Sequence, residues 1–496
     1  MTSNTNLTYL YCSDNQLTSL DVSLNTALTE LRCYRNELTS LNVNSNVALI
    51  ALHIGANSIS TLDVSANTAL NLLSCDNNQL TSLDVSANTA LTTLICHHNS
   101  LTSLDVSSNT ALARLECNHN SLTSLDVSTN TALIWLSCFS NQLTSLDVSA
   151  NTALRWLHCR YNQLTSLDVS TNTSLTYLNC EANQLTSLDV SSNTALGQLD
   201  CGNNQLTSLD VSSNTPLYQL VCGNNQLASL DVSSNTALTL LYCQTNQLTS
   251  LDVSNNTALS NLRCSNNQLT SLDVSSNTAL TQLRFYSNQI TEIDLSSNTA
   301  IGNLECGSNQ LTSLDVSSNT ALTSLACQNN QLTYLNMKNG LTEQVTDFNA
   351  TNNSLTCIEI LDPAWATSNW TSANGNIDAG VTFADICYAS NPSYTYVPDD
   401  NFEQALIDQG YDDVLDDYVL TVNISTVIYL NVAGYNVIDL TGIEGFPALT
   451  NLICYENQLT SLDVSANTAL TYLAVHDNQL TSLDVSNNTA LTQLYC

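Results

Sequence analysis

Cysteine is the first residue type in this sequence whose spacing suggests chemistry. Most of the 18 cysteines fall on one grid with a period of 21 residues, which also passes through Ile54 and Phe285. The cysteines on the grid are Cys12, Cys33, Cys75, Cys96, Cys117, Cys138, Cys159, Cys180, Cys201, Cys222, Cys243, Cys264, Cys306 and Cys327. They form no CxxC pair, and no histidine recurs at a metal-ligand offset from them. The column therefore lacks the usual spacing of a metal site.

Two structural roles remain for this cysteine column. Free cysteine packs as a small hydrophobic residue. Rungs about 4.8 Å apart would also allow disulfides between adjacent cysteines. Because Ile54, Phe285 and Val475 occupy the same column, we favour buried and inert thiols that contribute packing.

Aspartate forms a second column, at Asp21, Asp63, Asp84, Asp105 and on to Asp315. Calcium binding needs several carboxylate and carbonyl oxygens that converge, and such a column could supply them. The alternative is an Asx turn, in which each carboxylate accepts nearby backbone N–H groups. Asn42 and Asn336 replace the aspartate with no other change in their repeats, which favours the Asx turn.

Serine and threonine also recur in columns, such as Thr81 with Ser82 and Thr102 with Ser103. Flat hydroxyl arrays occur in ice-binding solenoids, but a solvated turn surface is the interpretation that we favour. No Ser/His/Asp arrangement can be assembled from the sequence, and paired carboxylates for acid–base catalysis are missing too. We therefore predict a protein that is not an enzyme and has no cofactor or metal site.

All these columns arise from one repeating unit, which residues 175–195 illustrate with the sequence LTYLNCEANQLTSLDVSSNTA. Leu178 and Cys180 alternate with polar residues, as in a short strand that buries every second side chain. Asn183 follows the strand, where its amide can pair with backbone groups of a tight coil. The second half is short and rich in Ser, Thr and Asn, which predicts turns or a single 3₁₀ turn.

A single repeat cannot bury its apolar face, so the repeats must stack on one another. We predict an α/β solenoid of leucine-rich repeats with a 21-residue period. A curved parallel β-sheet would form its concave face, and turns or short 3₁₀ segments its convex face. The grid gives 16 rungs between positions 12 and 327.

The domain organisation follows from where the period holds and where it fails. We predict a leucine-rich-repeat array over residues 1–340 and its C-terminal cap over residues 341–390. A linker with a helical N-terminal cap would span residues 391–427, and a second array would start over residues 428–496. The chain opens directly in repeat-like sequence and ends inside a repeat, so we expect a fragment of a longer protein, without a signal peptide.

Three local features support these boundaries. Around Phe348 a final rung is displaced by two residues. Cys357 and Cys387 lie off the grid, and a disulfide between them would fasten the cap. Residues 389–397 are typical of a linker, and the next residues, Pro398 and Asp399, predict a helix that continues to about Gln409.

The unit LxxLxCxxNxL followed by LTSLDVSxNTAL resembles the repeats of bacterial leucine-rich-repeat surface proteins, the cysteine-ladder internalins. The resemblance covers residues 1 to about 338 and about 428 to 496. The run IDLTGIE at residues 438–444 also resembles the opening repeat of internalin-like arrays. This resemblance implies a secreted or cell-surface protein that mediates adhesion to host or neighbouring cells. It does not imply a particular ligand, because one fold serves many functions.

The charge of the chain excludes several classes of partner. Acidic residues outnumber basic residues 43 to 8, which gives a formal net charge of -35. Nucleic acid binding needs clustered Lys and Arg, which are missing, and anionic membrane surfaces would repel the chain. No run of 18 apolar residues occurs, so we predict no membrane insertion.

The residues that vary between rungs carry the remaining information about function. All six histidines and six of the seven arginines lie beside the inward leucine and cysteine of a strand, on the predicted concave face. The densest group of basic and aromatic residues, in rungs five to nine, comprises His97, His98, Arg114, His119, Trp135, Phe139, Trp156, His158, Arg160, Tyr161 and Tyr177. Trp, Tyr and Arg are frequent in binding hot spots. Aromatic faces suit sugar rings, and Arg or His suit acidic groups.

The alternative for this group is drift at unconstrained positions. We favour function, and predict a monomeric, non-catalytic binding scaffold that recognises extracellular protein or glycan through these eleven residues. The alternative function is a passive structural spacer that holds other domains of a longer surface protein apart. An enzyme is the weakest hypothesis, because a smooth sheet rarely offers a pocket with converging titratable groups.

Overall fold

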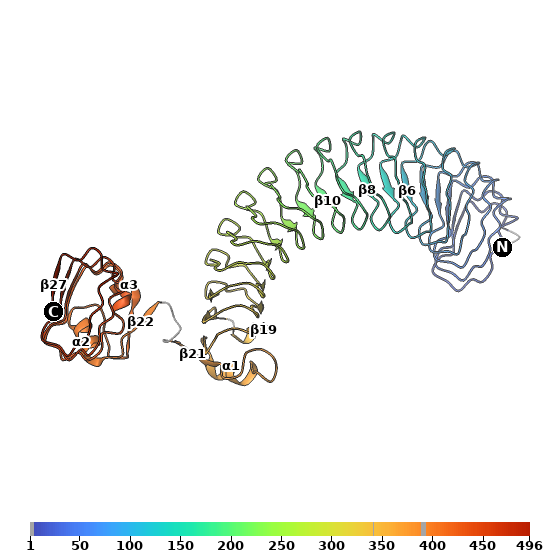
Figure 1. Cartoon of the computed structure of the whole chain (residues 1–496). Coiled ribbons are helices and arrows are strands. Elements are labelled where there is room, and N and C mark those ends of the chain that lie inside the picture. Colours follow the sequence, from blue (N-terminus) through green and yellow to red (C-terminus); the bar gives the residue numbers. More distant parts are fainter. Residues whose placement is uncertain (1–3, 341, 388–392) are drawn as a thin grey trace. The chain divides into compact units, whose positions relative to one another are not determined.

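The computed structural model describes residues 4–340, 342–387 and 393–496. The chain divides into two compact units (Figure 1). The first comprises residues 1–312, 316–331 and 343–352, and the second comprises residues 313–315, 332–342 and 353–496. The first four residues of the expected linker, 389–392, lie outside the described residues. Among the described ranges, no helix has the length and apolar character needed to cross a membrane.

The first unit is a solenoid whose short strands form one parallel sheet of 17 strands on the inner side of its arc (Figure 1). The strands are β1 (Tyr9–Tyr11), β2 (Glu30–Arg32), β3 (Ala51–His53), β4 (Leu72–Ser74), β5 (Thr93–Ile95), β6 (Arg114–Glu116), β7 (Trp135–Ser137), β8 (Trp156–His158), β9 (Tyr177–Asn179), β10 (Gln198–Asp200), β11 (Gln219–Val221), β12 (Leu240–Tyr242), β13 (Asn261–Arg263), β14 (Gln282–Arg284), β15 (Asn303–Glu305), β17 (Ser324–Ala326) and β19 (Asp347–Asn349). Neighbouring strands pair at the 21-residue offset, as Leu136 does with Leu157. The last pair is offset by two further residues, because Leu325 pairs with Phe348, which is the displaced rung expected from the sequence.

The core of each coil consists of the leucine, valine and cysteine columns. Leu157, Cys159 and Val169 of one rung are all fully buried. The described cysteines of the column are free thiols, and those from Cys33 to Cys327 are buried. Burial raises the pKa of the Cys138 thiol to about 12, so the thiolate that would react or bind a metal is strongly disfavoured. The expectation of buried, unpaired thiols is therefore confirmed.

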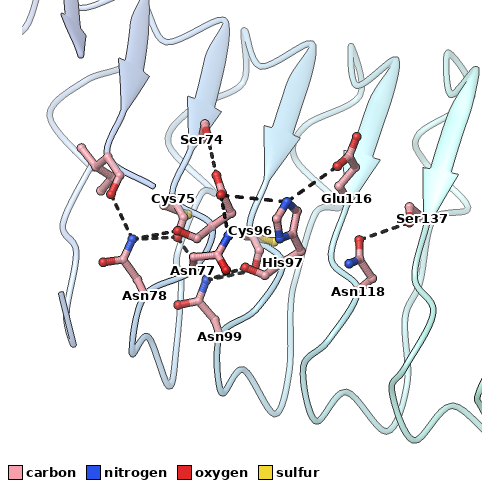
Figure 2. A network of polar contacts seen from close by, with 12 residues as sticks. Ser74, Cys75, Asn77, Asn78, Cys96, His97, Asn99, Glu116, Asn118 and Ser137 are labelled. Carbon is pink, nitrogen blue, oxygen red and sulfur yellow. Dashed lines mark hydrogen bonds and ion pairs between the residues drawn. The ribbon is translucent and has the colours of Figure 1, made fainter. Parts of the chain in front are cut away.

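Two columns of asparagine tie successive coils together. In the first column, the Asn99 Nδ2 donates to the carbonyl oxygens of Cys75 and Cys96, both at 3.1 Å (Figure 2). Its Oδ1 accepts the backbone N–H of Leu80 at 2.9 Å. In the second column, the Asn88 Nδ2 donates to two carbonyl oxygens of earlier rungs. These bonds join backbone groups of successive coils, and they satisfy hydrogen-bonding groups that would otherwise be buried with fewer partners.

The aspartate column forms Asx turns, as we expected. The Asp84 Oδ1 accepts the N–H of Ser86 at 2.9 Å. The hydroxyl and the N–H of Ser86 lower the pKa of the Asp84 carboxyl. Asn42 makes the same bond to the N–H of Asn44. Among the described residues, the column carboxylates do not gather into a group that could share a cation. The segments opposite the sheet are turns throughout the regular rungs.

The second unit contains a four-stranded parallel sheet in the order β16 (Ser313–Asp315), β18 (Tyr334–Asn336), β20 (Cys357–Glu359) and β21 (Thr382–Ala384). The segments LTSLD at β16 and LTYLN at β18 are strands here, although the equivalent segment of earlier rungs has no regular secondary structure. A 3₁₀ helix, η1 (Thr342–Gln344), and helix α1 (Pro363–Asn369) lie between these strands in sequence. Cys357 and Cys387 form a disulfide, with their Cα atoms 5.8 Å apart.

The remainder of the second unit begins with an antiparallel pair, β22 (Tyr394–Tyr396) and β23 (Tyr418–Leu420). Helix α2 (Asp400–Asp408) lies between them in sequence, with Asp399 as its N-cap. After α3 (Thr421–Ile424), a parallel sheet follows with β24 (Tyr429–Asn431), β25 (Asn451–Ile453), β26 (Tyr472–Ala474) and β27 (Gln493–Tyr495), and η3 (Ile443–Gly445) precedes β25. Phe402 and Leu406 of α2 are buried. Val432 takes the cysteine position, with its N–H 2.8 Å from the Ile453 carbonyl oxygen.

Candidate binding surface

Each strand of the first unit presents outward side chains on both sides of its inward leucine. In β7, Trp135 and Ser137 flank Leu136, and Phe139 follows Cys138. The next position is a turn residue with positive φ, which is 51° at His98, His119 and Tyr161. These three residues therefore lie on the turn that ends the strand, whereas the sequence pattern placed them with the strand residues. A left-handed residue there redirects the chain into the next part of the coil.

A stacked row of side chains runs across β6 to β9. The Arg114 guanidinium carbon lies 5.2 Å from the ring centroid of Trp135. The rings of Trp135 and Trp156 are 4.3 Å apart at 4°, and those of Trp156 and Tyr177 are 3.5 Å apart at 5°. The strands pair in register, so these residues occupy the same position of successive rungs. Both faces of Trp156 are covered by neighbouring rings, which leaves ring edges for a ligand.

A second group of rings continues alongside this row. His98 stacks on His119 at 4.0 Å, and Phe139 stacks on His158 at 4.3 Å. The His119 and Phe139 rings meet edge to face at 4.9 Å. The Arg160 guanidinium carbon lies 5.1 Å from the Phe139 ring centroid.

Three further contacts complete the surface. Arg160 also approaches the ring of Tyr161, at 5.2 Å. His97 contacts His98 at 5.3 Å, and His158 contacts Tyr177 at 6.0 Å. The structure thus brings all eleven residues named from the sequence into one contiguous surface, which we call the aromatic patch.

The sequence pattern did not identify the acidic residues of this surface. The Arg114 Nε donates to the Glu116 Oε1 at 2.6 Å. The Arg160 Nη1 lies 3.8 Å from the Glu181 Oε2. The His97 Nε2 lies 3.9 Å from Glu116 and 4.0 Å from the Asp76 carboxylate (Figure 2). These acids occupy the same variable columns as the basic residues, and that shared column was the available signal.

Burial shifts the titration of several groups in the patch. Burial, with Arg160 as a second cause, lowers the pKa of His158 to about 4. Burial also lowers the pKa values of His98 and His119. Burial and the nearby Glu181 raise the pKa of Asp200, next to the patch, to about 6. These three histidines are therefore neutral at pH 7, and the two arginines are balanced by glutamates.

Five buried nitrogen atoms of the patch have no hydrogen-bond partner within the protein. They are the Nε1 atoms of Trp135 and Trp156, the Nδ1 atom of His97, the Nε2 atom of His158 and the Nε atom of Arg160. A buried polar group without a partner costs about 1–3 kcal/mol. The stacked rings are therefore maintained at an energetic cost that Gln198 and Gln219, in the same column, do not carry.

This architecture defines a leucine-rich-repeat solenoid, a class of binding scaffolds with an extended concave surface. No protein-family model matches the sequence, and no protein with curated annotation matches it either. Among solved structures, the functional domain of InlJ from Listeria monocytogenes, which includes a cysteine ladder, is 40% identical with a TM-score of 0.65. That match covers 68% of this chain and 75% of the other. The chain therefore belongs to the internalin-like leucine-rich-repeat proteins.

Two further solved structures are similar. The internalin InlF from Listeria monocytogenes is 25% identical, with a TM-score of 0.50 and coverage of 62% of this chain and 88% of the other. A leucine-rich-repeat protein from Leptospira interrogans is 24% identical, with a TM-score of 0.62 and coverage of 74% and 100%. The second likeness shows the fold alone. The predicted fold class and the resemblance to internalins are confirmed.

Proposed function

We propose that this protein is an extracellular recognition or adhesion scaffold that binds a protein partner through the aromatic patch. The observation that carries the proposal is the continuous stack from Arg114 through Trp135 and Trp156 to Tyr177. Such a concentration of Trp, Tyr and Arg is typical of interface hot spots. The internalin relationship supports a location outside the cell.

The geometry of the rings favours a protein over a glycan. Sugar rings bind on open aromatic faces, but the two faces of Trp156 are covered by Trp135 and Tyr177. The free ring edges carry partial positive charge and suit carbonyl oxygens and the faces of other aromatic rings. A polypeptide supplies both groups. Its carbonyl oxygens are also suitable acceptors for the indole N–H groups of Trp135 and Trp156, which have no partner in the protein.

The test is a binding screen of the purified chain against arrays of extracellular proteins and glycans. The patch variant carries Trp135→Ala, Trp156→Ala and Arg160→Ala. A matched control carries Gln219→Ala, Asn303→Ala and Ser324→Ala, at the first position of strands outside the patch. We expect a protein ligand that the control retains and that the patch variant binds at least about a hundredfold more weakly.

Each other result has a defined meaning. A glycan ligand that depends on the patch would overturn the assigned ligand class. Equal binding by the patch variant and the control would show that the binding site lies outside the patch. Binding by none of the proteins to any ligand would favour the passive spacer. Circular dichroism melting curves of the two variants verify that both are folded.

A further inference from the structure

A second feature of the concave sheet concerns one arginine that has no acidic partner. Four arginines of this sheet lie within 4.0 Å of a glutamate oxygen, in the pairs Arg32–Glu30, Arg114–Glu116, Arg160–Glu181 and Arg284–Glu305. Arg263 has no such pair among the described residues, and its Nε is buried without a hydrogen-bond partner in the protein. In a chain with a net charge of -35, Arg263 therefore differs from the four paired arginines of this sheet.

The neighbours of Arg263 hold its guanidinium group in place without neutralising it. The guanidinium carbon lies 4.1 Å from the ring centroid of Tyr242, in the preceding strand. On the other side, Arg263 pairs in register with Arg284. Like charges at directly opposed positions repel each other. The Arg284 Nε lies 3.2 Å from the Glu305 Oε1, so that glutamate offsets the positive charge of Arg284. The positive charge of Arg263 is not offset by a neighbouring carboxylate.

Polar groups without partners accompany Arg263 on the same outer face. Ser265, two residues later, is only 1% exposed, and its Oγ has no hydrogen-bond partner in the protein. The Oε1 of Gln244 in the preceding rung is also without a partner. The Ser265 hydroxyl and the Arg263 guanidinium therefore lie in one rung, and both are hydrogen-bond donors of the kind that bind a carboxylate.

We propose that Arg263, supported by Tyr242, Arg284 and Ser265, forms a second binding site, specific for a carboxylate. The occupant is the side chain of an aspartate or glutamate in a protein partner. A guanidinium binds both oxygens of a carboxylate, and stacking on Tyr242 reduces the conformational freedom lost on binding. The negative charge of the rest of the chain repels acidic groups elsewhere, so this site would fix how a partner is placed along the sheet. The proposal rests on the proposed function only for the source of the carboxylate.

The site can be tested in the full chain without knowledge of the partner. The seven arginines give separate Nε–H signals in ¹⁵N NMR spectra, and Arg263→Lys identifies the signal of Arg263. The probe is N-acetylglutamate N-methylamide, and its neutral counterpart, N-acetylglutamine N-methylamide, is the control ligand. We expect the carboxylate probe to shift the Arg263 signal in a saturable manner and to leave those of Arg32 and Arg114 unchanged.

Two variants separate local recognition from general attraction of charge. Arg263→Gln and Arg155→Gln change the net charge equally, but Arg155 is exposed and lies outside the strands. We expect Arg263→Gln to weaken binding of the probe at least tenfold and Arg155→Gln to leave it unchanged. Arg263→Lys retains the charge and an aliphatic stem against Tyr242, but it loses the two-pronged contact and should still bind at least fivefold more weakly.

Three results would overturn the proposal. They are an Arg263 signal that does not move, a common shift of all arginine signals, and equal weakening of binding by both charge variants. A sialic acid that binds more tightly than the glutamate probe would instead assign the carboxylate to a sugar and overturn the protein source. The patch variant should keep the Arg263 response, so failure of the patch proposal and failure of this one are distinguishable.

Discussion

Strands β7 to β9 and strands β10 to β11 belong to one sheet. Their inward side chains are of the same type, but their outward side chains differ. Leu136 and Leu157 in the first group are fully buried, as are Leu199 and Leu220 in the second. The first outward position carries Trp135, Trp156 and Tyr177 in one group, and Gln198 and Gln219 in the other. The position after the ladder cysteine differs as well, with Phe139 and Arg160 against Gly202 and Gly223.

This comparison shows which positions the solenoid constrains. An inward side chain is enclosed by its own coil and by the coils on both sides, so its volume is fixed. An outward side chain contacts mainly the same column in neighbouring rungs, as Trp156 does with Trp135 and Tyr177. The outer surface can therefore acquire a binding patch in some rungs while the fold remains the same.

The largest expected effect tests whether the two interiors are equivalent. Leu157→Ala lies beneath the patch, and Leu220→Ala lies in a regular rung. Each should lower the free energy of unfolding by about 2–5 kcal/mol, because each leaves a cavity in a packed core. The two losses, measured by urea denaturation, should agree within about 1 kcal/mol. A much smaller loss beneath the patch would show that its rungs are packed differently.

The next prediction converts the patch into the regular surface. Trp135→Gln with Trp156→Gln introduces the residue found at Gln198 and Gln219. The double variant loses aromatic stacking, which is worth about 0.5–1.5 kcal/mol for each pair. It also loses the unpaired indole N–H groups, which offsets part of that loss. We expect a net change in unfolding free energy below about 2 kcal/mol, and a larger decrease would assign the rings a structural role.

The asparagine ladder gives a smaller and more uniform effect. Asn141→Ala lies in the patch region and Asn225→Ala in the regular region, and both amides donate to carbonyl oxygens of two coils. Each variant should lose about 1–3 kcal/mol of stability, because carbonyl groups lose their partners. Hydrogen exchange of the flanking strand amides measures whether the loss is local to each rung.

A pH titration should distinguish the two regions through His158. Its folded pKa, about 4, lies below the ordinary value of 6.5, because burial and Arg160 disfavour the charged form. Its contribution to stability is therefore present above pH 6.5 and is lost as the pH falls toward 4. Asp200 acts in the opposite direction. Its folded pKa, about 6, is raised, so its contribution is present below its ordinary pKa of 3.8 and is lost as the pH rises through 6.

Melting curves between pH 4 and 7 test these signs. His158→Asn introduces the residue found at Asn179, the same position of the next rung. This variant should lose less stability than the wild-type protein on acidification. Asp200→Asn should show the reverse, a steeper loss toward low pH. Equal pH dependence in all three proteins would contradict the assignment of both groups.

The smallest expected difference concerns the thiols. Burial raises the pKa values of Cys138, beneath the patch, and of Cys222, in a regular rung. Neither thiol should react with a disulfide reagent at pH 8 in the folded protein, and both should react after denaturation. Mass spectrometry of the modified peptides gives the comparison, and selective modification of Cys138 would show that the patch opens its core.

The 21-residue period made much of this protein predictable. A residue in an array contacts its own equivalents in neighbouring rungs, so one repeat specifies the strand, the buried Leu178 and Cys180, the bridging Asn183 and the Asx turn. The strands β16 and β18 were not predictable in this way, because their segments, LTSLD and LTYLN, match segments that lie outside strands in earlier rungs. β16 pairs with β18, β18 pairs with β20 and β20 pairs with β21, and the last two strands lie outside the regular repeat.

Some features of the candidate surface are likewise predictable from the repeat, and others are not. Residue spacing alone establishes that the variable residues share one face and that the fold is a leucine-rich-repeat solenoid, because strict alternation and a fixed period specify this arrangement. The folded structure was needed to show that the rings of Trp135, Trp156 and Tyr177 cover one another and that Arg114 and Arg160 are neutralised while Arg263 is not. The reason is that these properties depend on side-chain directions across rungs, and residue spacing fixes which columns are adjacent but not how their side chains meet.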